Sequence, residues 1–88
     1  MDALQQGDMR AYTQILVRLD RVEDGNLGDW GPVGDGVVEL RFMRTGTGYR
    51  LYIGLEGDDV VILYGGTKKT QTSDIKLARK LWREYKNG

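Results

Sequence analysis

The sequence predicts an α+β domain in which a small antiparallel sheet of three strands packs against an N-terminal helix and a C-terminal helix. The central stretch Val37–Tyr64 has the apolar patterns of strands and is divided by short turns. A stretch with helical spacing lies on each side of it. Because 88 residues suffice for one modest core, we expect a single domain over residues 1–88.

The N-terminal helix is expected to begin at Asp8. Its apolar residues recur at three- and four-residue spacing and form one face for packing: Tyr12, Ile15, Leu16, Leu19 and Val22. The next segment, Glu23–Gly36, holds five glycines and the only proline, which predicts a long connection. We expect Leu27, Trp30 and Val33 to order this connection, with Trp30 at the edge of the core.

The first two strands show the period-two alternation of a half-buried sheet. Their apolar faces hold Val38, Leu40 and Phe42 in the first strand, Val37–Met43, and Tyr49, Leu51, Ile53 and Leu55 in the second, Tyr49–Leu55. Thr45–Gly48 is the predicted turn. We expect Arg41 opposite Tyr52, because the shorter pairing sets Arg41 against the like charge of Arg50. The expected register also pairs Phe42 with Leu51 and Leu40 with Ile53.

The opposite face of these two strands is polar and is where we expect any function to lie. It carries Glu39, Arg41, Arg50 and Tyr52. After the turn Glu56–Asp59, the third strand, Val60–Tyr64, is apolar at every position. Such a strand is usually covered on both faces, so we expect it to be the most buried of the three.

A basic loop and a helix close the chain. The loop Gly65–Thr72 contains Lys68 and Lys69, and Ser73 is the predicted N-cap of the helix. The helix has an apolar side, Ile75, Ala78, Leu81, Trp82 and Tyr85, opposite a basic side.

Composition narrows the possible functions. The chain has no cysteine and no histidine, so we expect no disulfide, no metal site and no cofactor. Thirteen basic and thirteen acidic residues cancel, so that only a local basic patch could attract nucleic acid. No apolar run approaches a membrane span and no signal-peptide core is present, which favours a soluble cytoplasmic protein without membrane contact.

Three motifs resemble the RelE/ParE superfamily of toxins from type II toxin-antitoxin modules, in particular the HigB-like, phage-derived addiction module killer proteins. They are VGDGVxELR from Val33, GYRxY from Gly48 and GG-x-K-x-x-Q-x-x-DI from Gly65. The resemblance extends from about Arg10 to about Lys86. It implies a small antiparallel sheet packed by helices, cleavage of mRNA on the ribosome, and a cognate helix-turn-helix antitoxin that covers the site.

The sequence departs from the family pattern in two respects. The usual first strand would lie before Met1 and is expected to be missing, which would leave an open sheet edge for self-association. The strand lysines of RelE correspond to Val37 and Glu39 here, whereas Arg50 matches the arginine that the family carries on its sheet.

The resemblance and the residues together suggest a metal-free ribonuclease site. Attack of a 2′-hydroxyl on the phosphate needs a base, cations and a proton donor. Arg41 and Arg50 would hold the phosphate, because a guanidinium matches its geometry, and Glu39 is the candidate base. The alternative is an ordinary surface ion pair between Glu39 and either arginine.

Three further residues are candidates for binding the flanking RNA. Lys68 and Lys69 would contact its backbone and Tyr52 would stack on a base. Two other functions stay open: a ParE-like toxin that inhibits DNA gyrase by contact, and a catalytically inactive relic that only binds antitoxin.

Overall fold

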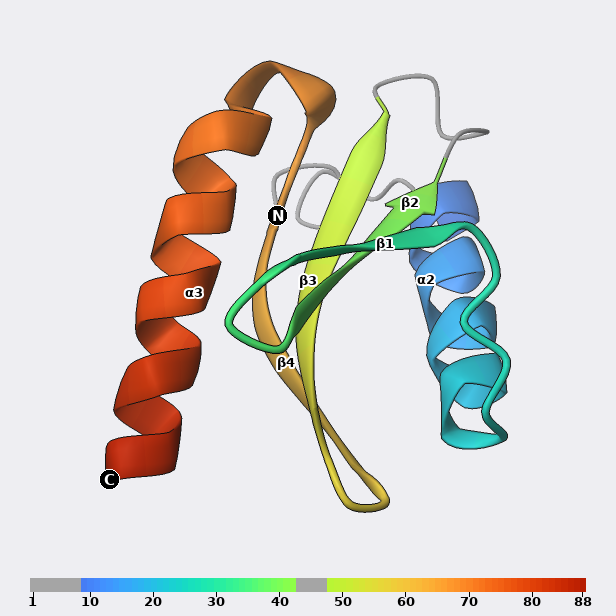
Figure 1. Ribbon diagram of the computed structural model, residues 1–88. Helices are drawn as coiled ribbons and strands as arrows, with labels where there is room; N and C mark the ends of the chain where they lie inside the picture. Colours follow the sequence, from blue (N-terminus) through green and yellow to red (C-terminus); the bar gives the residue numbers. More distant parts are fainter. Residues whose placement is uncertain (1–8, 43–47) are drawn as a thin grey trace.

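The structure is a computed structural model that describes residues 9–42 and 48–88. Its elements, in chain order, are α2 (Met9–Glu23), β1 (Trp30–Gly34), β2 (Val37–Phe42), β3 (Tyr49–Glu56), β4 (Asp59–Gly66), the short 3₁₀ helix η2 (Lys68–Thr70) and α3 (Gln71–Asn87) (Figure 1). The α+β class is confirmed. The expected helix start at Asp8, the side chain of Tyr12 and most of the turn Thr45–Gly48 lie outside the described residues.

The sheet has four antiparallel strands in the order β1-β2-β3-β4. The three expected strands are present, and part of the expected connection forms the fourth, β1. This strand was missed because Gly31 and Pro32 are poor strand formers, although proline is tolerated at a sheet edge. Leu27 and Val33 pack on the core as expected, whereas Trp30 is 43% exposed and does not close the core edge.

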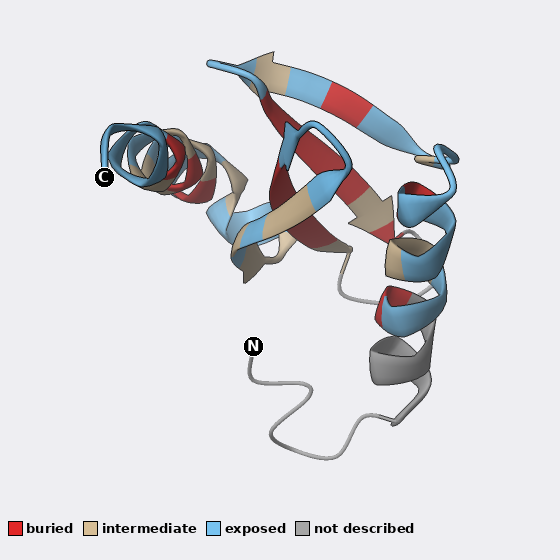
Figure 2. Cartoon of the chain, turned by 90° about the horizontal axis from the view of Figure 1, so that it is seen from below, coloured by how far each residue is buried: buried red, intermediate tan, exposed pale blue. Residues whose placement is uncertain are grey.

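The sheet stands between the two helices, with α2 on one face and α3 on the other (Figure 2). The core beneath α2 consists of Ile15, Val22, Val38, Leu40, Phe42, Leu51 and Ile53. The core beneath α3 consists of Val37, Tyr52, Ala78 and Trp82. Trp82 approaches the strand backbone at Gly54, where an added Cβ would stand 2.5 Å from the indole ring.

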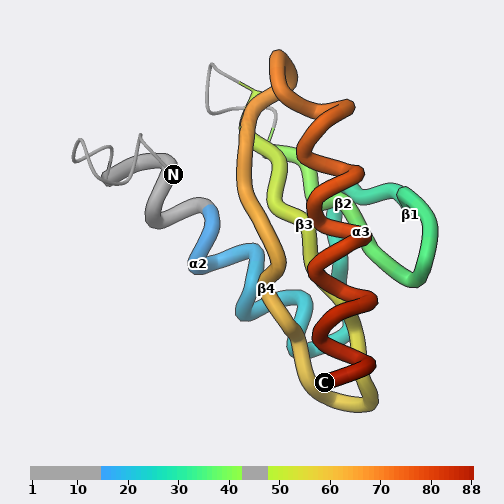
Figure 3. The backbone as a smooth tube through the Cα atoms, turned by 90° about the vertical axis from the view of Figure 1, so that its left-hand side faces the viewer, coloured from blue at the N-terminus to red at the C-terminus, as the bar shows by residue number. Residues whose placement is uncertain are grey.

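β4 is an edge strand, on the opposite side of the molecule from β1 (Figure 3). The expectation that Val60–Tyr64 is the most buried strand is therefore wrong. Val61 and Leu63 pack beneath α3, whereas Ile62, which pairs with Ile53, and Tyr64 are 55% and 40% exposed. Val60 packs on the core beneath α2, so the apolar run has core contacts on both faces of the sheet although the strand lies at an edge.

The register of β2 and β3 also differs from the expected one. Arg41 pairs with Arg50, Leu40 with Leu51 and Phe42 with Tyr49. Alternation is preserved, since the shift is by two residues, so both faces have the expected strand residues. The like charges of Arg41 and Arg50 are tolerated because the carboxylate of Glu39 lies near both guanidinium groups.

The helix α3 begins at Gln71, two residues before the expected cap Ser73. The hydroxyl of Ser73 instead donates to the carbonyl of Thr70, 3.1 Å away. Thr70 precedes the helix, and its own hydroxyl bonds Asp74 in the first turn. The helix therefore starts early enough for Gln71 to reach the polar face of the sheet.

Candidate functional site

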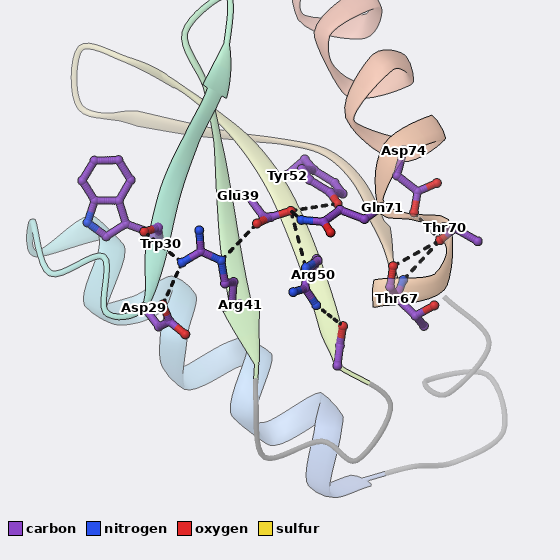
Figure 4. Close-up of polar contacts among 11 residues, drawn as sticks. Asp29, Trp30, Glu39, Arg41, Arg50, Tyr52, Thr67, Thr70, Gln71 and Asp74 are labelled. Atoms are coloured by element: carbon purple, nitrogen blue, oxygen red, sulfur yellow. Dashed lines mark hydrogen bonds and ion pairs between the residues drawn. The ribbon is translucent and has the colours of Figure 1, made fainter.

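Glu39 is the centre of a polar network on the α3 side of the sheet (Figure 4). It is only 1% exposed. Its Oε1 accepts a hydrogen bond from Arg41 Nε at 3.1 Å. Its Oε2 accepts from Tyr52 at 3.2 Å and from Gln71 Nε2 at 2.7 Å, and lies 3.5 Å from Arg50 Nε. Both carboxylate oxygens are thus occupied, as a buried charge requires.

Arg41 links the network to the sheet edge. Its Nη1 donates to Asp29 Oδ1 at 2.9 Å and to the carbonyl of Trp30 at 3.2 Å. The hydrogen bond that Arg41 donates to Asp29, and to a lesser extent the one that it donates to Glu39, raises the pKa of Arg41. Its side chain is 32% exposed, so a ligand can reach it.

Gly31 makes room for this guanidinium. A Cβ at Gly31 would overlap Nη2 of Arg41. The glycine in β1 therefore helps to fix where the Arg41 head group lies.

The Arg50 side chain is more buried than its position in the strand predicts. It is 7% exposed, and its Nη1 donates to the carbonyl of Gly48 at 2.8 Å. Its Nε is buried and has no hydrogen-bond partner among the described residues, although the ion pair with Glu39 is close. Alternation within β3 places Arg50 on the polar face of the sheet, but the folded chain buries it there.

Tyr52 is fully buried, with 0% exposure. Burial, and secondly the charge of Glu39, raises the pKa of its phenol well above the usual range. The phenol donates to Glu39 and has no free face on which a base could stack. In this structure Tyr52 supports Glu39. The expected stacking of Tyr52 on an RNA base does not fit this conformation.

The sequence reasoning missed Gln71, Thr70 and Asp74 as members of the site. Gln71 donates to Glu39, and the hydroxyl of Thr70 donates to Asp74 Oδ2. An added Cβ at Gly66 would overlap the same carboxylate, so a glycine is needed there. The signal was present in GG-x-K-x-x-Q-x-x-DI, in which Gly66 makes room for Asp74 and Gln71 reaches Glu39.

Lys68 and Lys69 lie in η2, beside this network, and are exposed. A Cβ at Gly48 would stand 3.4 Å from both the Cβ of Lys68 and Nη1 of Arg50. The structure therefore brings Lys68 close to Arg50, as expected from the sequence. Arg41, Arg50 and the two lysines lie around one end of the sheet.

The arginines and lysines at this end of the sheet are suited to holding an anion. Within residues 9–42 and 48–88, no three acidic, histidine or cysteine side chains are grouped so that they could hold a metal ion. In the same residues, no helix is long and apolar enough to cross a membrane. Guanidinium and ammonium groups around a sheet end bind phosphate by charge and by directed hydrogen bonds.

Comparison with known proteins identifies the family of this chain. A sequence model of the family described as phage derived protein Gp49-like matches residues 2–83. An uncharacterised protein of Haemophilus influenzae is 44% identical over 78 residues, which cover 88% of this chain and 78% of that protein. No solved structure matches significantly.

The chain belongs to the phage-derived Gp49-like family, which is a family of RelE/HigB-like toxins. Its fold agrees with a RelE-like architecture. Family membership indicates a phage-derived toxin of a toxin-antitoxin module, with an antitoxin as partner.

Proposed function

We propose that the protein is a toxin that cleaves mRNA on the ribosome without a metal ion, within a HigB-like branch of the family. Its cognate helix-turn-helix antitoxin would neutralise it by covering the site. The observation that carries this proposal is the direct opposition of Arg41 and Arg50 across neighbouring strands, close to Lys68 and Lys69 in η2. These groups supply positive charge from two sides of the sheet end.

In this proposal Arg41 contacts the phosphate and Arg50, which is 7% exposed, acts through its charge, and both stabilise the charge that develops during attack by the 2′-hydroxyl. Arg41 has an accessible guanidinium, and Arg50 is its cross-strand partner on β3. Fixed donors of this kind stabilise a transition state more than a ground state because they need no reorganisation. Lys68 and Lys69 bind the flanking backbone.

Glu39 acts in this proposal by positioning the arginines rather than as the base. Both of its oxygens are engaged by protein donors and its side chain is 2% exposed, so a 2′-hydroxyl has no access to it. The base would then come from the substrate-bound ribosome or from water.

A second candidate, a toxin that acts by protein contact as ParE does on DNA gyrase, is favoured by a different observation. Exposed apolar side chains gather on α2 and β4: Leu16, Val17, Ile62 and Tyr64. Such a surface suits a protein partner and requires no catalytic group.

Growth arrest with mapping of mRNA ends separates these functions. Cells would express the wild type, Arg41→Gln, or the control Arg21→Gln, which removes an equal charge from the exposed side of α2. We expect arrest and new mRNA 5′ ends with the wild type and the control, and a loss of about a hundredfold in cleavage with Arg41→Gln. Arrest with intact mRNA favours the gyrase function, and absence of arrest favours an inactive relic.

A further inference from the structure

A second cationic site lies along α3. An open pocket of about 350 Å³ is lined by Lys76, Arg79 and Arg83. These residues are spaced three and four apart, so they lie on one side of the helix. At 1.5 Å per residue, they span roughly 10 Å along its axis.

An internal carboxylate is bound at the edge of this pocket. Asp35, in the turn between β1 and β2, accepts hydrogen bonds on Oδ2 from Arg79 Nε at 3.1 Å and from Arg83 Nη1. These hydrogen bonds lower the pKa of Asp35. The Arg79 guanidinium also lies over Gly34, where an added Cβ would stand 3.1 Å from it. The turn thus holds the two guanidinium groups in place.

Only one oxygen of Asp35 is used, and the cations exceed the anions. Asp35 offers one negative charge against three positive ones, and Arg79 and Arg83 keep 40% and 54% of their side chains exposed. The Lys76 ammonium group forms no hydrogen bond or ion pair with any of the described residues. The pocket therefore retains a net positive charge that faces solvent.

The distribution of charge over the whole chain points the same way. Residues 68–88 contain seven basic and two acidic residues, a net charge of +5, whereas residues 1–67 contain six basic and eleven acidic residues, a net charge of −5. A polyanion is therefore drawn to the side formed by η2 and α3 although the chain is neutral.

We propose that the pocket of Lys76, Arg79 and Arg83 binds the phosphate backbone of RNA, outside the site at Arg41 and Arg50, with Asp35 as a competing internal anion. The proposal rests on the proposed function, because it adds a second contact to the same substrate class. Guanidinium pairs match phosphate in a bidentate way. An acidic peptide fits less well, since the pocket lining contains only cationic residues and no apolar anchor, and anchors dominate protein contacts.

Removing a cation from the pocket and removing the anion at its edge should change the affinity for RNA in opposite directions. Fluorescence anisotropy would measure the affinity of the full chain for a single-stranded oligouridylate over a range of salt concentrations. We expect Lys76→Gln to weaken binding several-fold and to reduce the salt slope by about 0.7, the value for one lost contact to a single strand. Asp35→Asn should strengthen binding by a few-fold. Asparagine tolerates the positive φ of 57° at this position, so the turn is kept.

Lys80→Gln is the matched control, because it removes the same charge from an exposed position of α3 outside the pocket. Equal effects of Lys76→Gln and Lys80→Gln, or no gain from Asp35→Asn, would overturn the proposal. A response to polyglutamate but not to the RNA would assign the pocket to an acidic polypeptide and also overturn it.

The failure of this proposal is distinct from that of the proposed function. If ribosome-dependent cleavage occurs while the pocket variants bind RNA as the wild type does, the pocket proposal fails alone. If the variants change RNA affinity as expected but no mRNA is cleaved, the pocket proposal stands and the endonuclease function fails.

Discussion

Arg41 and Arg50 lie directly opposite each other on β2 and β3, and the carboxylate of Glu39 lies 3.1 Å from Nε of the first and 3.5 Å from Nε of the second. Two like charges in cross-strand register are unfavourable by themselves. The buried carboxylate offsets this repulsion and fixes both guanidinium groups at the end of the sheet. Stability and the proposed activity therefore depend on the same side chain.

Glu39→Gln is predicted to destabilise the fold. The amide keeps the shape but removes the charge between two arginines, and breaking a buried ion pair costs about 3–5 kcal/mol. Urea unfolding would measure the change in free energy. Glu56→Gln, at the exposed end of β3, is the control and should change it by about 0.5 kcal/mol or less. Equal stability of Glu39→Gln and the wild type would show that the network does not hold the arginines.

Gly31→Ala is predicted to reduce cleavage with little change in stability. Its Cβ would overlap Nη2 of Arg41, which is the end of a flexible side chain and can move away. A displaced guanidinium no longer meets the phosphate, so the rate should fall by about tenfold or more. Cleavage assays with thermal melts would measure both effects. Full cleavage in this variant would argue against a role for the Arg41 position.

The ionisation of Tyr52 is predicted to lower the free energy of unfolding at alkaline pH. Its pKa is raised in the fold by burial and by Glu39, so the unfolded chain, with a tyrosine pKa of about 10, releases this proton first. The contribution of the phenol is complete below about pH 10 and declines as the pH rises toward the folded pKa. It should decline by about 1.4 kcal/mol per pH unit.

Unfolding of Tyr52→Phe beside the wild type between pH 8 and pH 11 tests this effect. The variant lacks the hydrogen bond to Glu39 and should be less stable at pH 8 by about 1–2 kcal/mol. Because it also lacks the ionising phenol, the difference should narrow above about pH 10. Tyr64→Phe, at an exposed ring, should follow the wild type. A constant difference across this range would contradict the account.

We predict that the protein self-associates through the outer edge of β4. Among the described residues, β4 pairs with a strand on one side only, and no charge interrupts Val60–Gly66. Two copies paired antiparallel about Ile62 and Leu63 would set the acidic turn Glu56–Asp59 of each copy near Lys68 and Lys69 of the other, which favours a symmetric dimer.

Sedimentation at rising protein concentration would detect this dimer. Ile62→Lys should abolish it, because a charge on an edge strand prevents pairing. Val17→Lys, which adds the same charge to an exposed apolar position of α2, should not. A monomer at every concentration would remove the edge as an interface.

The order of elements and the two faces of the central strands could be predicted because period-two alternation is local. Val38, Leu40 and Phe42 share a face with Leu51 and Ile53, as expected, and Glu39 shares the opposite face with Tyr52. On α2, Ile15 and Val22 are buried as expected, while Leu16 is 48% exposed because the helix covers only part of the sheet.

Register and burial could not be predicted in the same way because they depend on contacts between distant segments. The mutual repulsion of Arg41 and Arg50 argues against their pairing when only the sequence is considered, because the sequence does not show that Glu39 is buried between them. Arg50 is 7% exposed and pairs with Gly66 of β4, and alternation within β3 cannot predict this burial. Gln71 joins Glu39 across 32 residues of sequence for the same reason.

The most direct test of the central claim is to map the 5′ ends of a defined mRNA after incubation with the purified protein, with and without ribosomes. The account predicts new ends within the reading frame only when ribosomes are present, and their loss in Arg41→Gln but not in Arg21→Gln. An mRNA that stays intact on ribosomes at saturating amounts of the folded wild type would contradict the claim that this sheet end is an RNA-cleaving site.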